Sequence, residues 1–266
     1  MLWGVLRALA LLLCLVLTSC AAVSGGSDRV VTATTVDGER TALVHRPAGI
    51  RPGAPLVIVM HGSGGNGAAA RSRFGWDPVA DREGFVVAYP DGLDRSWNSG
   101  TCCRGAAARG VDDVGYLHGL VARLATEDGI DPRRVIAVGF SNGAMMAYAW
   151  ACARPGDLAG IGPVAGQVLV RCDDPGPVPV AAVHGLADTV VQVADPPPGK
   201  PTAAQSIALF RTGCAEPPAV ERAAPATVTT WTCPGGRAVT LDLIDGLGHT
   251  WPDDVAEFLW ARLRPV

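Results

Sequence analysis

The sequence predicts a single α/β domain with a mainly parallel central sheet and helices on both faces. Short apolar runs alternate with segments of helical periodicity, which is typical of parallel strands joined by right-handed crossovers. The chain has 266 residues, which suffice for one substantial core. Its 33 glycines and 21 prolines indicate many tight turns between short elements, and this composition disfavours a helical bundle.

The expected strands comprise an N-terminal hairpin and several buried runs. Asp37-Gly38 is a two-residue turn signal within the β-forming segment 30–46, so an antiparallel hairpin is expected at one edge of the sheet. Continuous apolar runs are typical of strands that are buried on both faces. Such runs occupy residues 56–60, 85–89, 135–138, 178–183 and 239–244.

Helices are expected between these strands. Residues 114–127 carry apolar side chains at helical spacing, and Asp112 or Asp113 can cap this helix. Gly84 is expected to end a helix over residues 76–83. Further helices are expected at 143–153, 203–210 and 255–263, and a loop pinned by disulfides is expected at 97–110.

The N-terminal segment has the features of a lipoprotein signal peptide. Arg7 precedes an apolar run over residues 8–17, which is too short to span a bilayer comfortably. The run ends in LTSC, which resembles the bacterial lipobox, so cleavage is expected to leave Cys20 as a lipidated N-terminus. The expected organisation is a signal peptide over 1–20, a short tether over 21–28 and a folded domain over 29–266, held at the outer face of the cell membrane. An ordinary signal peptide, cleaved near Ala21 or Ala22, is the alternative.

The other cysteines predict disulfides. Of the eight cysteines, Cys14 leaves with the signal peptide and Cys20 carries lipid, so six remain, which allows up to three disulfides outside the cytoplasm. The candidates are Cys102, Cys103, Cys152, Cys172, Cys214 and Cys233. Spacing does not determine their connectivity, and Cys214 with Cys233 is taken as the most local pairing. No CxxC or HExxH pattern occurs, so no metal site is expected.

Ser141 is the candidate nucleophile. It lies in GFSNG at residues 139–143, the one G-x-S-x-G pattern of the chain. The pattern follows a β run and precedes a helix-compatible segment, as in the nucleophile elbow of the α/β-hydrolase fold. Glycines two residues on either side allow a strained turn that projects the hydroxyl above the sheet edge. An α/β-hydrolase fold is therefore expected, and an ordinary glycine-rich turn is the competing interpretation.

A base and an acid are expected to follow Ser141 in the chain. His249 comes after the last β run on a glycine-rich loop, where this fold carries its histidine. Asp188 comes between the two, in a turn after a predicted strand, as expected of the acid that orients the imidazole. The weaker candidates are the histidines at 45, 61, 118 and 184 and the aspartates at 173, 174, 195 and 245.

Backbone amides are expected to stabilise the oxyanion. In this architecture they come from the residue after the nucleophile and from the loop after an early strand, which indicates Asn142 and Ser63. Gly62 or Gly64 takes the place of Ser63 if the register differs by one residue. Trp97 and Trp251 are candidates to line the acyl or aromatic pocket, and a place in the core is the alternative for either.

Several stretches are similar to the polyhydroxybutyrate depolymerase-like and feruloyl esterase-like family, often grouped with carbohydrate esterase family 1. They span most of residues 56–252 and include VIVMHGSGGN, REGFVVAYPDG, WNSGTCCRG, DPRRVIAVGFSNGAMMAY, VHGLADTVV and DGLGHTWP. The resemblance implies that Ser141 is the nucleophile, Asp188 the acid and His249 the base of a secreted enzyme without metal or cofactor. It also implies short acyl or aromatic esters as substrates. Polymer depolymerases usually carry a separate binding domain after the catalytic one, whereas this chain stops at Val266, so soluble oligomers or acetyl and feruloyl esters are expected.

Ester hydrolysis through an acyl-enzyme is the expected reaction, with a small or oligomeric ester as the substrate. Acyl transfer is the enzymatic alternative, because a sugar or lipid hydroxyl can resolve the same acyl-enzyme. A surface lipoprotein that uses the fold only for binding is the non-enzymatic alternative. The net charge of -3 provides no basic excess, so nucleic acid is not an expected partner.

Overall fold

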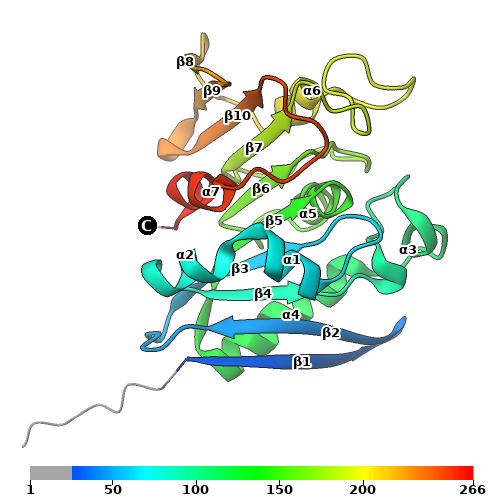
Figure 1. Cartoon of the computed structure of the whole chain (residues 1–266), viewed down its shortest axis with the longest axis vertical. Coiled ribbons are helices and arrows are strands. Elements are labelled where there is room, and N and C mark those ends of the chain that lie inside the picture. The colour runs from blue at the N-terminus through cyan, green and yellow to red at the C-terminus, as the bar shows by residue number, and fades with distance from the viewer. Residues whose placement is uncertain (1–25, 266) are drawn as a thin grey trace, which may run out of the picture.

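A ten-stranded sheet runs through the molecule. The computed structural model describes residues 26–265, and Figure 1 shows the strands side by side with helices packed against them. Their spatial order is β1-β2-β4-β3-β5-β6-β7-β10-β9-β8. The strands are β1 (Ser27–Thr35), β2 (Gly38–Arg46), β3 (Ala54–Met60), β4 (Val86–Pro90), β5 (Ile130–Phe140), β6 (Gly160–Val164), β7 (Val180–Gly185), β8 (Ala219–Ala223), β9 (Ala226–Thr232) and β10 (Ala238–Ile244).

The sheet is parallel in its centre and antiparallel at both edges. The neighbours from β4 through β3, β5, β6 and β7 to β10 are all parallel. The hairpins β1–β2 and β8–β9 extend it with antiparallel pairs. This confirms the mainly parallel sheet. The N-terminal hairpin also forms, but its two turn residues are Val36 and Asp37, one position before the predicted Asp37-Gly38, because Gly38 pairs with Thr35 as the first residue of β2. The second hairpin was not expected, because all five residues of β8 are exposed and its sequence lacks a buried-strand pattern.

Helices cover both faces of the sheet. On one face α4 (Asp113–Asp128), α5 (Asn142–Ala153) and α6 (Ala203–Ala208) pack over one apolar cluster. On the other, α1 (Gly67–Phe74), α2 (Trp76–Glu83) and α7 (Val255–Leu263) pack over a second cluster. Strand β3 shows how the sheet separates them, because Leu56 and Ile58 lie in the first cluster and Val57 and Val59 in the second. The three-layer arrangement is the α/β-hydrolase fold that the sequence predicts.

Two elements near the centre of the fold carry weak sequence signals. Helix α1 has the sequence GAAARSRF, whose small and basic residues make no clear apolar stripe, and its N-cap Asn66 is what defines its start. Strand β6 has the sequence GIGPV, and its five residues are all buried. Its glycines and proline disfavour a strand prediction, so the sequence gives no strand signal here. The short helix α3 (Arg104–Ala108) lies inside the segment expected to be a loop.

The N-terminal predictions fall mostly outside the described residues. The expected signal peptide, the lipidated Cys20 and residues 21–25 of the tether belong to this part. Strand β1 begins at Ser27, which pairs with Arg46, so residues 27 and 28, which were expected in the tether, belong to the hairpin. None of the helices between residues 26 and 265 is both long and apolar enough to cross a membrane. Within the same residues, no three metal-binding side chains cluster together.

The carboxyl ends of the central strands meet at one edge of the sheet. Met60 of β3 pairs with Gly139 of β5, and Ile244 of β10 pairs with Gly185 of β7. The loops that follow these strands therefore emerge side by side, as ligand-binding loops of open parallel sheets do. They carry Ser63, Ser141, Asp188 and His249.

A buried ion pair holds the N-terminal hairpin to helix α4. Arg40 of β2 donates from Nη2 to Asp113 Oδ1 at 2.6 Å, and the two side chains are 1% and 0% exposed. The other oxygen of Asp113 accepts from the Asn98 amide at 2.7 Å, while the Arg40 guanidinium lies 4.1 Å over the Tyr116 ring. Burial raises the pKa of Asp113 above its ordinary value, although the Asn98 amide and Arg40 act in the opposite direction.

Asp113→Ala is expected to lower the free energy of unfolding by about 3–5 kcal/mol, because it leaves the Arg40 charge buried without its partner. Asp173→Ala is the matched control, since Asp173 pairs with Arg171 where both side chains are largely exposed. Its loss should stay within about 1 kcal/mol. Urea unfolding followed by circular dichroism measures both variants. Similar losses in the two would contradict a special role for the buried pair.

Candidate active site

Ser141 sits on a strained turn between β5 and α5. Its φ and ψ are 54° and -117°, in a region that non-glycine residues rarely adopt. The turn is held from both sides, because the Ser141 amide donates to the Val164 carbonyl at 2.9 Å and its own carbonyl accepts from the Met145 amide at 3.0 Å. This geometry lifts the hydroxyl off the line of β5 and above the sheet edge.

The two glycines of the motif are required by close backbone contacts. A Cβ on Gly139 would overlap the carbonyl of Gly143, where strand and helix nearly touch. A Cβ on Gly143 would overlap the carbonyl oxygen of Met60 at the end of the neighbouring strand β3. The sequence interpretation of these glycines therefore matches a physical constraint on both sides of Ser141.

The structure brings Ser141, His249 and Asp188 together. His249 Nε2 lies 2.9 Å from Ser141 Oγ, and His249 Nδ1 lies 2.7 Å from Asp188 Oδ2. A carboxylate accepts only, so Nδ1 carries the ring proton and the lone pair of Nε2 faces the serine hydroxyl. The three residues lie 108 and 61 positions apart in sequence, and the loops at the sheet edge supply all of them.

Asp188 is buried and fully engaged. Its side chain is 0% exposed, and Oδ1 accepts from the backbone amides of Val190 and Val191, each at 2.8 Å. Burial alone raises the pKa of Asp188, but the hydrogen bonds from His249, Val191 and Val190 outweigh it, so that the pKa lies below its ordinary value. The carboxylate is therefore charged at neutral pH and faces the imidazole.

His184 contacts the same carboxylate from the other side. Its Nε2 lies 2.8 Å from the Val191 carbonyl and 3.3 Å from Asp188 Oδ2. Burial lowers the pKa of His184, so the ring is neutral at pH 7 and its Nε2 proton is shared between these oxygens. The sequence indicated only packing or hydrogen bonding for this histidine. The contact with Asp188 was not predicted, because no known sequence motif includes it.

The loop after β3 lies against the nucleophile. A Cβ on Gly62 would come within 3.5 Å of Ser141 Cβ, so this loop and the first turn of α5 form one small cradle. Gly64 is excluded as an oxyanion donor, because its amide already donates to the Arg95 carbonyl at 2.7 Å. Within residues 26–265, the amides of Ser63 and Asn142 have no protein acceptor, while Ser63 Oγ accepts from Arg104 Nε at 2.8 Å.

His61 fixes the start of that loop. Its Nε2 accepts from the Gly92 amide at 2.9 Å, which leaves the ring proton on Nδ1, where it is donated to the Gly62 carbonyl at 2.8 Å. Burial lowers the pKa of His61, so the neutral ring that this pattern needs is favoured. The hydrogen-bonding role suggested by the sequence describes it well.

The side chain of Asn142 anchors the loop after β4. Its Oδ1 accepts from the Trp97 amide at 2.7 Å, and its Nδ2 donates to the Trp97 carbonyl at 3.0 Å and to Ser99 Oγ at 3.1 Å. Trp97 itself is fully buried, and its indole donates to the His61 carbonyl at 2.9 Å. The prediction that Trp97 lines the substrate pocket is therefore wrong: it is a core residue beneath the site.

A cavity of about 580 Å³ opens beside His249. The glycine-rich loop forms one wall, and the aromatic side chains of Phe74, Phe140 and Trp251 form another. Phe74 and Trp251 stack with their ring centroids 4.2 Å apart. Trp251, a candidate pocket residue, lines this cavity, whereas Phe74 was missed because α1 was not recognised as a helix.

All six candidate cysteines form disulfides within the described residues. The pairs are Cys102–Cys103, Cys152–Cys172 and Cys214–Cys233. The prediction that Cys214 with Cys233 is the most local pairing is wrong, because the Cys102–Cys103 disulfide joins residues that are adjacent in the chain. It lies in the loop that Asn142 holds, where the Cys102 carbonyl accepts from the Ser99 amide at 2.8 Å.

Comparison with known proteins agrees with this architecture. The Phospholipase/Carboxylesterase family model matches residues 108–197, which contain Ser141 and Asp188. The chain is 32% identical over 227 residues to NocK of Nocardia uniformis subsp. tsuyamanensis, an inferred esterase, with 75% of this chain and 66% of NocK covered. It is 32% identical to poly(3-hydroxyalkanoate) depolymerase C of Paucimonas lemoignei, over 50% of this chain and 32% of that protein. It is 29% identical to feruloyl esterase B of Piromyces equi, over 57% of this chain and 30% of that protein.

These matches confirm the resemblance drawn from the sequence. The chain spans about two thirds of NocK and about a third of the other two proteins. Among solved structures, acetyl xylan esterase from Aspergillus awamori superimposes with a TM-score of 0.66 at 15% identity, covering 87% of this chain and 97% of that one. At this identity the superposition shows the shared fold.

Asn142→Ala is expected to lower the free energy of unfolding by about 2–4 kcal/mol, because it leaves the buried Trp97 amide without an acceptor and removes the bonds that Asn142 Nδ2 donates to the Trp97 carbonyl and Ser99 Oγ. Asn66→Ala is the matched control. Asn66 is exposed and caps α1 through a single bond to the Ala69 amide, so its loss should cost about 1 kcal/mol. Chemical denaturation of both variants gives the comparison. If Asn142→Ala costs no more than Asn66→Ala, the Asn142 contacts do not hold the loop.

Proposed function

We propose that this chain, an α/β-hydrolase-fold protein, is a serine-dependent carboxylic ester hydrolase. One observation carries the proposal: Ser141 Oγ lies 2.9 Å from His249 Nε2 while Asp188 holds Nδ1 at 2.7 Å. A hydroxyl, an imidazole and a buried carboxylate in this order form the arrangement that activates serine for attack on acyl groups. The names of the relatives, which include an inferred esterase and a feruloyl esterase, support the same class of reaction.

In the first half of the proposed reaction, Ser141 Oγ attacks the ester carbonyl carbon and its proton passes to His249 Nε2. The carbonyl oxygen becomes an oxyanion, which the unpaired amides of Ser63 and Asn142 are suited to stabilise. Asp188, held in its charged form, stabilises the imidazolium that results. Collapse of the intermediate breaks the bond to the alcohol oxygen, which takes the proton from His249 and leaves.

In the second half, water attacks the acyl-enzyme. His249 accepts a proton from the water as its oxygen bonds to the acyl carbon, and the same amides stabilise the second oxyanion. Collapse releases the carboxylic acid and returns the proton to Ser141. Each half moves one proton through His249, so one imidazole acts first as a base and then as an acid in both.

The shape of the cavity supports short or aromatic acyl groups as substrates. Its walls combine the aromatic rings of Phe74, Phe140 and Trp251 with the polar glycine-rich loop, and its volume of about 580 Å³ lies in the range of small-molecule sites. We infer esters of hydroxybutyrate oligomers, or feruloyl and acetyl esters, as the substrate class.

We also infer that the protein is exported and held by lipid at the outer face of the membrane. The three disulfides support an oxidising compartment, where such bonds form and persist. The LTSC sequence that ends at Cys20 supports diacylglycerol attachment to that cysteine.

Ser141→Ala is expected to reduce ester hydrolysis to background, because the acyl-enzyme can no longer form. Asp188→Asn should lower kcat by roughly four orders of magnitude, because Nδ1 loses the acceptor that sets the tautomer of His249. Hydrolysis of p-nitrophenyl acetate, butyrate and octanoate and of methyl ferulate provides the measurement. Ser72→Ala, on the exposed face of α1, is the matched control and should keep wild-type rates.

A serine-reactive fluorophosphonate adds a second readout for this prediction. Mass spectrometry should find the label on Ser141 in the wild-type protein and no label in Ser141→Ala. Full activity in Ser141→Ala would refute the proposed mechanism. Labelling without hydrolysis of any ester, tested again with an added alcohol acceptor, would favour acyl transfer.

Cys20→Ala is expected to release the protein from the membrane fraction, since the thiol is the proposed point of lipid attachment. Expression in a bacterial host with lipoprotein processing, followed by fractionation and by metabolic labelling with an alkyne fatty acid, checks this. The wild type should be labelled and sediment with membranes. Cys14→Ala is the control and should behave like the wild type, and equal labelling of both variants would contradict the assignment.

A further inference from the structure

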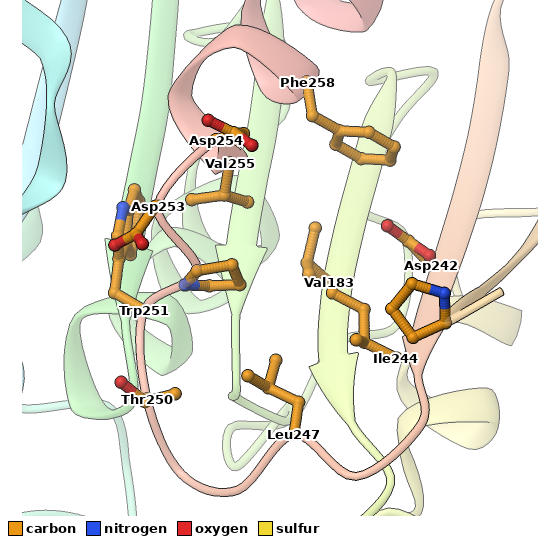
Figure 2. A pocket seen from close by; sticks show the side chains of 12 residues that line it. Val183, Asp242, Ile244, Leu247, Thr250, Trp251, Asp253, Asp254, Val255 and Phe258 are labelled. Carbon is orange, nitrogen blue, oxygen red and sulfur yellow. The ribbon is translucent and has the colours of Figure 1, made fainter.

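A second cavity of about 580 Å³ adjoins the catalytic one. It lies between β7, β10, α7 and the loop that carries His249, as Figure 2 shows. The two cavities share three lining residues, Thr250, Trp251 and Asp253. The proposed hydrolysis uses no other residue of this second cavity.

Asp242 of β10 presents a buried carboxylate to this cavity. Its side chain extends from β10 toward Val183 and Phe258 in Figure 2, and the residue is 5% exposed. The side chain of Asp242 has no hydrogen bond or ion pair with any residue between 26 and 265, and its Oδ1 is wholly enclosed. An uncompensated carboxylate in such a place is costly by several kcal/mol, so a partner that donates hydrogen bonds would bind it strongly.

Arg262, a cation that acts on Asp242, is engaged elsewhere. Arg262 of α7 influences Asp242 electrostatically, but its Nη1 donates to the Phe258 carbonyl at 3.4 Å and its Cζ lies 3.6 Å over the Phe258 ring centroid. Burial raises the pKa of Asp242, and Arg262 offsets this only in part. The protein itself therefore leaves the carboxylate unsatisfied.

The composition of the lining points to the charge of the missing partner. The described residues around the cavity include three carboxylates, on Asp242, Asp253 and Asp254, and no lysine, arginine or histidine. The remaining walls are mainly apolar and come from Val183, Pro225, Ile244, Leu247, Val255 and Phe258. An ammonium group on an apolar body matches both the negative charge and the apolar walls of this cavity.

We propose that this cavity is a binding site for a compact organic cation, a protonated amine on an alkyl or aryl body, whose ammonium group pairs with Asp242. The apolar body lies against Phe258, Val183 and Leu247. Binding here is distinct from the ester chemistry at Ser141 and does not depend on it.

Calorimetric titration of benzylamine at pH 7.5 tests the site. The Ser141→Ala protein is used, so that turnover plays no part, and benzyl alcohol serves as the neutral probe of the same shape. Benzylamine should bind with one site per chain and at least about tenfold more tightly than benzyl alcohol, because the charge-assisted hydrogen bond to Asp242 is lost in the alcohol. Asp242→Asn in the Ser141→Ala protein should weaken the binding of benzylamine at least tenfold and leave the affinity for benzyl alcohol little changed.

Asp245→Asn is the matched control, since Asp245 is exposed at the end of the same strand and does not line the cavity. It should bind benzylamine like the parent protein. Leu247→Trp, which fills the cavity while keeping Asp242, should abolish binding of both probes. No binding of benzylamine to the parent protein, or equal binding to the parent and to Asp242→Asn, would overturn the proposal.

Discussion

The strained backbone at Ser141 is the constraint on which the rest of the site depends. A non-glycine residue at φ 54° and ψ -117° costs about 1–3 kcal/mol, so the turn persists only because its surroundings leave no alternative. Those surroundings are the two strands beside β5. The Val164 carbonyl of β6 accepts from the Ser141 amide, and α5 packs so closely against Met60 of β3 that only glycine fits at position 143. The position of the nucleophile is thus a property of the central sheet rather than of its own loop.

The other functional groups lie on loops, and contacts with neighbouring segments hold each loop in place. Asp188 is immobilised by two amides of its own turn and by His184, and it in turn orients His249. The glycine-rich loop is held by His61, which bonds to the loop after β4. Asn142 joins that same loop to the helix behind the nucleophile. Each loop is therefore tied to a neighbour that is distant in sequence, which is how a site made of loops gains definition.

Much of this arrangement could be predicted from local sequence patterns, and the rest depends on contacts that such patterns do not reveal. The G-x-S-x-G motif, the order of Asp188 and His249, and the buried runs each have a signature within a few residues, so the fold and the three central side chains could be named from sequence. Helix α1 and strand β6 could not, because packing overrides their weak intrinsic preferences. The contacts of Asn142 and the burial of Trp97 arise between segments far apart in the chain and leave no local trace. His184 lies only four residues from Asp188, but no sequence pattern marks the contact between them.

Trp251 borders two chambers. Its indole stacks on Phe74 within the catalytic cavity, and it also lines the chamber beneath α7. Thr250 and Asp253 border both chambers as well, so the partition belongs to the short segment that follows His249, and Trp251 is its largest side chain. A substitution in this segment therefore reshapes both chambers at once, without any alteration to the sheet that holds the nucleophile.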